Sequence, residues 1–118
     1  MTSPRIRGKI NLGYRARMIT HNVLFRLKRP ASTADRSQLV ERLRRFAENP
    51  PHAFGPATVE ESLLLRGESP HTADVMMTVV FVNAKDFPEY ASSPGHVQLV
   101  EETLEPMCEG WWSVQFES

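Results

Sequence analysis

A histidine that opens a short helix is the residue of this chain best suited to proton-transfer chemistry. The sequence Ser93-Pro94-Gly95 comes directly before His96 and predicts a helix start, which places His96 in the first helical turn. The free N–H groups of a first turn carry partial positive charge, so they disfavour an imidazolium and keep the ring neutral near pH 7. A neutral imidazole accepts protons, and His96 is therefore a candidate general base.

The elements on either side of this helix are predicted strands. Apolar runs over 75–82 and 111–116 flank it, so His96 lies between two core strands and its side chain can face a cavity. The other predicted elements are a strand over 19–28, a helix from the capping sequence at 32–35 to the break at 49–51, a strand over 58–66, a strand over 73–83, a helical turn over 85–90, a helix over 94–108 and a strand over 111–117.

The order of these elements predicts the fold class. Strand, helix, strand, strand, helix, strand, joined by right-handed crossovers, gives a ferredoxin-like βαββαβ plait of the α+β class, with a four-stranded antiparallel sheet and both helices on one face. The strand over 73–83 is apolar on both faces, since Met76, Val80 and Val82 alternate with apolar neighbours. Because the helices can cover only one face, we expect a second copy of the chain to cover the other, giving an obligate homodimer.

The composition disfavours several classes of function. The 118 residues fit one domain, and 14 basic against 14 acidic side chains leave no net charge, which disfavours a nucleic-acid partner. The single cysteine, Cys108, has no companion at metal-ligand spacing, so we expect no metal site and a buried thiol in a reducing compartment. No apolar stretch could span a bilayer and no secretory signal is evident, so a cytoplasmic protein without membrane contact is expected.

The chain begins with a basic arm, residues 1–17. The arm contains no acidic side chain and five basic ones, namely Arg5, Arg7, Lys9, Arg15 and Arg17. A solvated tail, an extra or swapped strand and an organelle-targeting peptide are all open interpretations of this segment.

Four segments resemble the stress-responsive α/β-barrel (Dabb) domain family. They are the strand over 19–28, the strand over 74–81, the segment from Tyr90 to His96 and the ending over 112–117. The most specific of these features are the early strand histidine, His21, and the segment that joins Tyr90 to His96. The resemblance assigns residues 18–118 to the domain. It implies that two plaits dimerise sheet against sheet into an α/β barrel, and that no metal or organic cofactor is needed.

The resemblance also implies a pocket. The family is similar in part to small polyketide cyclases of the olivetolic acid cyclase type, in part to lyases acting on cyanohydrins, and in part to stress proteins with no assigned reaction. In the cyclases, a strand histidine, a tyrosine before the turn and the histidine opening the last helix line the pocket, and these positions match His21, Tyr90 and His96. A second pocket tyrosine of the cyclases falls near Leu43 here, so a different substrate orientation is expected.

The expected activity is a cofactor-independent cyclase or lyase reaction, most simply the aldol-type cyclisation of a hydrophobic poly-β-carbonyl, polyketide-like small molecule. His96 would take a proton flanked by two carbonyls, and Tyr90 or His21 would donate to the carbonyl oxygen that becomes charged. An apolar enclosure would exclude water from this reaction. Its expected wall residues are Val23, Phe25, Leu39, Leu43, Val97 and Val100.

Two other interpretations stay open. The same scaffold suits a cofactor-free monooxygenase acting on an electron-rich phenol, and a stress-responsive structural or small-molecule-binding protein needs no reaction at all. In the second case His96 only serves the helix start, His21 is a hydrogen-bonded core residue, and Tyr90 packs its ring against the sheet.

Four further residues are expected to serve structure. His52 and His71 occur in Pro-containing loops and are expected to be exposed. Trp111 and Trp112 are adjacent in a predicted strand and should face opposite sides of the sheet. One of them would then meet the helices, and the other would seal the dimer or an end of the barrel.

Overall fold

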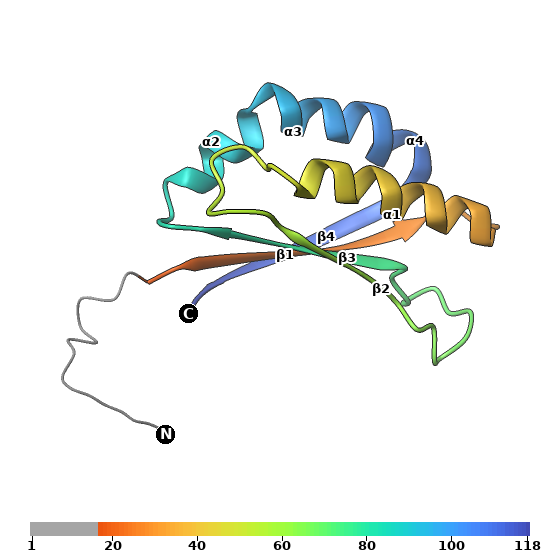
Figure 1. Cartoon of the computed structure of the whole chain (residues 1–118). Coiled ribbons are helices and arrows are strands. Elements are labelled where there is room, and N and C mark those ends of the chain that lie inside the picture. Colours follow the sequence, from red (N-terminus) through yellow and green to blue (C-terminus); the bar gives the residue numbers. More distant parts are fainter. Residues whose placement is uncertain (1–16) are drawn as a thin grey trace, which may run out of the picture.

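The computed structural model describes residues 17–118, so the basic arm lies outside the described residues except for Arg17. The elements in chain order are β1 (Ile19–Leu27), α1 (Thr33–Ala47), β2 (Thr58–Glu61), β3 (Val75–Phe81), α2 (Asp86–Ser92), α3 (Pro94–Leu99), η2 (Val100–Leu104), α4 (Glu105–Met107) and β4 (Cys108–Glu117). The strands form an antiparallel sheet in the order β2-β3-β1-β4, and all helices lie on one face of it (Figure 1). This arrangement confirms the predicted ferredoxin-like plait.

One strand is much shorter than predicted. The expectation of a strand over 58–66 is wrong beyond Glu61, which pairs with Val75, the first residue of β3. Past that point the Ser62 backbone N–H still donates to the Asp74 carbonyl oxygen at 2.8 Å, and the strand then ends. Leu63 and Leu65 are 81% and 89% exposed, and Leu64 adopts a positive φ of 55°. Leucine content alone therefore overstated the length of this strand, because no core lies beneath it.

The first helix has the predicted start. The Ser32 side chain accepts a hydrogen bond from the Asp35 backbone N–H at 3.0 Å, and the Asp35 carboxylate accepts one from the Ser32 backbone N–H at 2.9 Å. This capping box satisfies N–H groups that the helix itself leaves free. The helix then buries Leu39 and Leu43 completely against the sheet.

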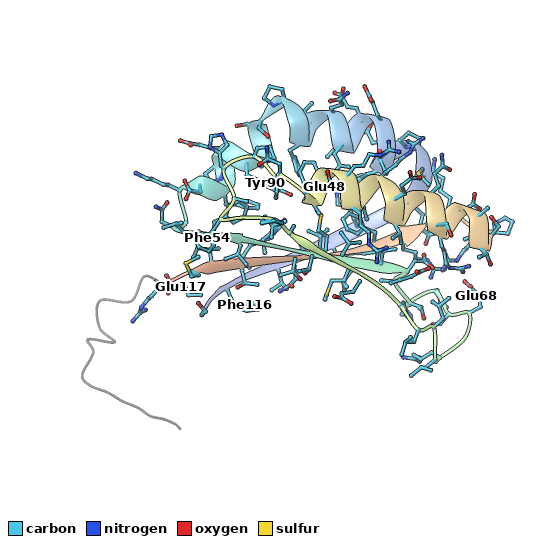
Figure 2. The ribbon with its side chains drawn as sticks, in the orientation of Figure 1. Glu48, Phe54, Glu68, Tyr90, Phe116 and Glu117 are labelled. Carbon is cyan, nitrogen blue, oxygen red and sulfur yellow. The ribbon has the colours of Figure 1, made fainter. Side chains whose placement is uncertain are left out.

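The sheet has one covered face and one open face. Residues 19, 21, 23, 25 and 27 of β1 point toward the helices and are buried, and alternate residues of β3 do the same. The other face, here called the open face, carries large apolar side chains that are 42–57% exposed, namely Leu24, Val82, Trp112, Val114 and Phe116. Figure 2 shows Tyr90 between the helices and the sheet, and Phe116 on the opposite side of the sheet. The predicted uncovered apolar face is therefore present.

A buried carboxylate fixes the end of the sheet where β1 leads into α1. Asp74 is fully buried and accepts a hydrogen bond from the Leu27 backbone N–H at 2.9 Å. Arg29 donates to the same carboxylate at 2.8 and 3.2 Å, and Arg36 of α1 donates at 3.2 Å. Burial by itself raises the pKa of Asp74, but the hydrogen bonds from Arg29 and Leu27 outweigh it, and the pKa is lowered. Because Asp74 binds both Leu27 of β1 and Arg36 of α1, it links the sheet to the helix layer.

Within residues 17–118, no helix is long and apolar enough to cross a membrane.

Candidate functional site

The three residues singled out by sequence meet in one cavity. A space of about 140 Å3 lies between the helices and the β1–β4 side of the sheet. His21 reaches it from β1, Tyr90 from α2 and His96 from α3. Its other lining residues are Val23, Phe25, Met77, Phe87, Ala91, Leu99, Leu104, Trp111 and Ser113. A few polar groups in an otherwise apolar enclosure are the usual composition of a small-molecule site.

His96 is placed by the capping residue of its helix. The Ser93 hydroxyl accepts a hydrogen bond from the His96 backbone N–H at 3.3 Å, and Pro94 fills the first helical position. The ring nitrogen Nδ1 of His96 lies 3.0 Å from the carbonyl oxygen of Ala91. Because a carbonyl oxygen only accepts, Nδ1 carries the ring hydrogen and Nε2 keeps a free lone pair. Nε2 is then the atom that can take a proton.

The neutral state expected for His96 is supported, but for a different main reason. Burial lowers the pKa of His96, and the Ala91 carbonyl opposes that shift only partly. The positive end of the helix was the cause expected from the sequence, whereas desolvation is the larger cause of the lowered pKa of His96. The half-buried ring also contacts Tyr90, with centroids 4.7 Å apart. The His96 ring does not point into bulk solvent.

His21 lies deeper than His96. Its side chain is 4% exposed, and the Gln115 amide nitrogen lies 2.8 Å from its Nδ1. Burial, followed by repulsion from a charged His96, lowers the pKa of His21 to about 4. Its ring packs edge-on against Phe87 and Tyr90, with centroid distances of 4.9 and 5.8 Å. His21 is therefore neutral at pH 7.

Tyr90 supplies a hydroxyl inside the cavity. The residue is 1% exposed, and burial raises its pKa, so the phenol stays protonated. Tyr90 lines the cavity, so its phenol can donate a hydrogen bond to a bound molecule.

The predicted walls are only partly correct. Val23 and Phe25 line the cavity, whereas Leu39 and Leu43 are fully buried in the core below α1. Val97 is 39% exposed on the outer side of α3, and Val100 packs at the edge of the core. The cavity lies under α2 and α3 rather than under α1, which explains the errors at Leu39 and Leu43; Val97 and Val100 lie on α3 and η2 but do not line the cavity.

The missed lining residues come largely from β4 and α2. Trp111 and Ser113 face the cavity because they pair with Phe25 and Val23 on the neighbouring β1 strand. Gln115 pairs with His21 in the same register. The alternation of β4 placed these three on one face, but only the register with β1 shows which face that is.

The remaining aromatic, histidine and cysteine positions named from the sequence are as follows. Trp112 lies on the open face and Trp111 on the cavity side, as predicted. His52 and His71 are exposed, as predicted. Cys108 is buried, and its burial raises the pKa of the thiol to about 11, so it is unreactive at neutral pH. Among residues 17–118, no group of three or more His, Cys, Asp or Glu side chains could hold a metal ion.

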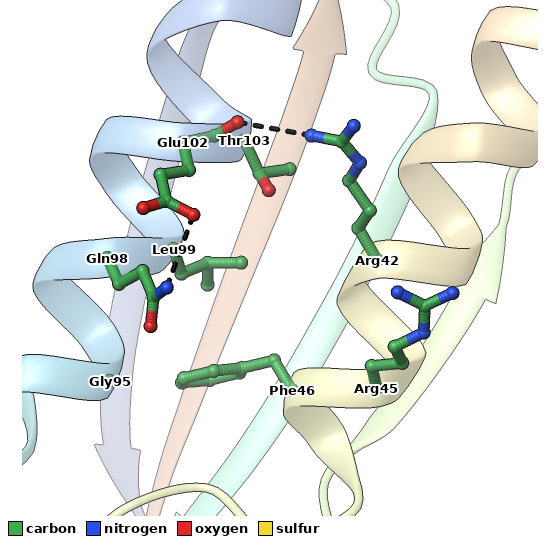
Figure 3. A pocket seen from close by; sticks show the side chains of 8 residues that line it. All are labelled: Arg42, Arg45, Phe46, Gly95, Gln98, Leu99, Glu102 and Thr103. Carbon is green, nitrogen blue, oxygen red and sulfur yellow. Dashed lines mark hydrogen bonds between the residues drawn. The ribbon is translucent and has the colours of Figure 1, made fainter.

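A second hollow lies outside the cavity, between α1 and the helix formed by α3 and η2. Figure 3 shows Arg42 and Arg45 on the α1 side of this groove of about 480 Å3, and Gln98 and Glu102 on the other. Arg42 donates to the Glu102 carbonyl oxygen at 3.1 Å. Phe46 also lines the groove, and its ring centroid lies 6.3 Å from that of His96. Leu99 lines both the groove and the cavity and so lies between them.

Comparison with known families identifies the domain. The family described as the stress-responsive A/B barrel domain, Dabb, matches residues 19–118. The chain belongs to this family. The resemblance inferred from the four sequence segments is therefore confirmed. No curated protein matches the chain.

Several solved structures share the fold. A dimeric ferredoxin-like protein of unknown function from Thermobifida fusca has a TM-score of 0.68 at 20% identity, covering 92% of this chain and 97% of its own. The hydroxynitrile lyase of Passiflora edulis has a TM-score of 0.67 at 17% identity, covering 88% and 95%. SnoaB, a cofactor-independent oxygenase from Streptomyces nogalater, has a TM-score of 0.59 at 14% identity, covering 87% and 94%. The fold thus occurs both in enzymes and in proteins without a known reaction.

Proposed function

We propose that this Dabb protein is a cofactor-independent lyase or cyclase that makes or breaks a carbon–carbon bond by aldol-type chemistry, with His96 as its general base. The observation that carries the proposal is the meeting of His96, Tyr90 and His21 in one apolar cavity. Both imidazoles are kept neutral by burial, and the phenol is kept protonated. One base and two hydrogen-bond donors are the groups that such a reaction needs.

The proton returns at the end of the proposed cycle. In bond formation, His96 Nε2 takes a proton from a carbon next to a carbonyl, and the charge moves to the carbonyl oxygen. The resulting enolate carbon attacks a second carbonyl, forming the new bond and an alkoxide. The His96 imidazolium then gives its proton to the alkoxide. In bond cleavage, His96 takes the hydroxyl proton, the carbon–carbon bond breaks, and the proton goes to the leaving carbanion.

The size of the cavity limits the substrate. An engineered protein cavity of about 150 Å3 binds a molecule of the size of benzene, and this cavity measures about 140 Å3. Only a reacting portion of that size is enclosed. A short hydrophobic carbonyl compound or cyanohydrin fits, while a long poly-β-carbonyl chain has to extend beyond the walls. The hydroxynitrile lyase among the structural neighbours acts within the same fold, which supports the lyase form of the proposal.

The same proposal includes a homodimer formed through the open face. Its large exposed apolar side chains lie on one face of the sheet, and an exposed apolar patch of this kind marks an interaction surface. Two copies related by a twofold axis would cover each other's open face and form an α/β barrel. The Thermobifida fusca neighbour is described as dimeric. We also propose a cytoplasmic location, since the one cysteine is a buried free thiol.

The test is a substrate panel run on matched variants. Mandelonitrile cleavage is followed by the appearance of benzaldehyde, and cyclisation of a 3,5-dioxo ester is followed by chromatography. His96→Asn keeps a nitrogen donor for the Ala91 carbonyl but has no basic nitrogen. We expect roughly 10²–10⁴-fold lower kcat for this variant. His71→Ala removes an exposed loop histidine and should leave activity unchanged.

The panel also separates the alternative functions. Oxygen uptake with an electron-rich phenol, unchanged in His96→Asn, would favour a monooxygenase. If the wild-type protein turns over no member of the panel while a benzaldehyde-sized ligand still perturbs the His96 resonances, it is a binding protein. Equal activity of His96→Asn and wild type would overturn the assignment of His96 as base.

A further inference from the structure

Two polar residues of β4 reach the proposed site from its rim. Ser113 lines the cavity, and Gln115 lies two residues further along the same face of the strand. The Gln115 amide nitrogen lies 2.8 Å from His21 Nδ1 and 3.1 Å from the Ser113 hydroxyl oxygen. One side chain therefore contacts both a ring of the proposed site and a hydroxyl of the cavity wall.

Counting hydrogens on this amide determines the state of His21. An amide nitrogen has two hydrogens and cannot accept a hydrogen bond. Both of its acceptors are present, namely the Ser113 oxygen and the His21 Nδ1 lone pair. The single hydrogen of the neutral His21 ring must then sit on Nε2. Ser113 uses an oxygen lone pair as acceptor, so its own hydroxyl hydrogen stays free to donate.

His96 has the opposite arrangement. Its Nδ1 faces the Ala91 carbonyl oxygen at 3.0 Å and so carries the ring hydrogen, which leaves Nε2 as an acceptor. The two histidines of one cavity thus differ in the nitrogen that holds the hydrogen. His21 presents an Nε2–H donor, and His96 presents an Nε2 lone pair. A base-catalysed carbonyl reaction needs both: an acceptor that takes the proton and a donor that binds the carbonyl oxygen.

We propose that Gln115 is a positioning residue that holds His21 as an Nε2–H donor, so that His21 stabilises the negative oxygen of the reacting carbonyl while His96 removes the proton. This inference rests on the proposed function. Without Gln115, a neutral His21 could exchange its hydrogen between the two ring nitrogens. The molecules with hydrogen on Nδ1 would then present an Nε2 lone pair to the developing oxyanion and repel it. The class of ligand that this arrangement recognises is a neutral carbonyl compound that becomes an oxyanion.

Gln115 contacts the buried His21 ring from an exposed position. Gln115 and Ser113 are exposed, whereas His21 is buried. β4 is the edge strand of the sheet, so its cavity side has no further strand beside it. The exposed Gln115 amide therefore supplies a hydrogen bond to the buried His21 ring. A substitution there changes the ring without removing core volume, which makes the proposal testable in a folded protein.

The first test is a nuclear magnetic resonance measurement of the ring nitrogens in the full-length protein without ligand. Long-range proton–nitrogen correlation spectra identify which imidazole nitrogen is protonated. At pH 7.5 we expect hydrogen on Nε2 for His21 and on Nδ1 for His96. A hydrogen on His21 Nδ1 would show that the amide presents its oxygen instead, and would overturn the inference whatever the protein's activity.

The second test changes the amide alone. Gln115→Glu has the same shape, but a carboxylate accepts from Nδ1–H, so the His21 hydrogen should move to Nδ1 and the ring should become easier to protonate. Loss of an oxyanion donor typically lowers kcat by roughly 10²-fold, and we expect a decrease of that size. Gln38→Glu, on the exposed side of α1, makes the same chemical change away from the site and should alter neither readout.

The outcomes separate this inference from the proposed function. If Gln115→Glu moves the His21 hydrogen but the wild-type protein turns over no carbonyl substrate, the positioning role stands and the function is wrong. If His96→Asn abolishes activity while Gln115→Glu leaves kcat and the His21 spectrum unchanged, the function stands and the positioning role is wrong. A Gln115→Glu variant that keeps its fold, moves the hydrogen and retains full kcat would also overturn it.

Discussion

The rings of Tyr90 and His96 lie 4.7 Å apart between centroids, although the two residues belong to separate helices. Ser93 connects them. Its backbone is extended, with ψ of 149°, so α2 stops and α3 starts in a new direction. Its hydroxyl donates to the Tyr90 carbonyl oxygen at 2.7 Å and accepts from the His96 backbone N–H at 3.3 Å. One buried serine therefore fixes the proposed donor against the proposed base.

Ser93→Ala should accordingly affect both stability and activity. Loss of an N-cap side chain typically costs about 1 kcal/mol, and we expect a decrease of that size in the free energy of unfolding by urea denaturation. We also expect kcat to fall by more than the loss of folded protein explains. Ser92→Ala, at the neighbouring exposed position, is the control. Equal activity of the two variants would show that the cap does not position His96.

The pH dependence of the reaction should reflect a base that is easy to deprotonate. Burial holds the pKa of His96 below its ordinary value of 6.5. Since only the neutral ring can take a proton, kcat/KM should be constant at neutral pH and decline only below pH 6.5. Tyr90 has a pKa above its ordinary value of 10, so it should cause no decline below pH 10. An acid limb centred above pH 6.5 would contradict the assignment.

Protein stability should fall in acid because of His21. The folded pKa of about 4 lies below the ordinary 6.5, so the unfolded chain binds more protons between these values. The contribution is complete above pH 6.5 and is lost as the pH falls toward 4. At about 1.4 kcal/mol per pKa unit, the loss amounts to roughly 3 kcal/mol. Urea denaturation from pH 7.5 to 4.5 should show a smaller decrease in His21→Gln than in the wild-type protein. A variant that matches the wild-type decrease would show that His21 is not the cause.

The buried carboxylate of Asp74 should be the most sensitive charged position in the fold. Asp74→Asn keeps the shape but leaves Arg29 and Arg36 without their buried partner. Breaking a buried ion pair on one side costs about 3–5 kcal/mol, and the partly exposed arginines favour the lower end. Chemical denaturation measures the change. Glu101→Gln, exposed on η2, should cost almost nothing by comparison.

The proposed dimer depends on the open face, and Trp112 is 56% exposed there. Trp112→Glu would bury a charge in the interface, so we expect monomers at micromolar concentration by light scattering where the wild-type protein is dimeric. Val97→Glu makes a similar change at a 39% exposed position of α3, on the helix side of the sheet and opposite the open face. It should leave the oligomeric state unchanged. A monomeric wild-type protein would contradict the dimer directly.

The periodicity of single elements accounts for what the sequence predicted correctly. Alternation in β1 and β3 and the three-to-four spacing in α1 report which side of an element is buried, since burial imposes those periods locally. The capping box at Ser32 and the turn before His96 are likewise local features. These signals, with the element order, were enough for the plait and for choosing His96, whereas His21 and Tyr90 were chosen through the family resemblance.

The errors and omissions arise where residues distant in sequence decide the outcome. Sequence alone could not show that β2 stops at Glu61, because that depends on where β3 begins to pair. The cavity walls were misplaced because the position of α2 and α3 over the sheet follows from packing, not from the composition of either helix.

The sequence by itself determined the order of elements, the buried faces and the chemical groups available for proton transfer, because each of these is set by neighbours within a few residues. Only the tertiary structure decided that Gln115 meets His21 across 94 positions, and that the Ala91 carbonyl fixes the other ring. The strand register and the break between α2 and α3 create both contacts. They decide which nitrogen of each histidine holds its hydrogen, and so which ring can be the base.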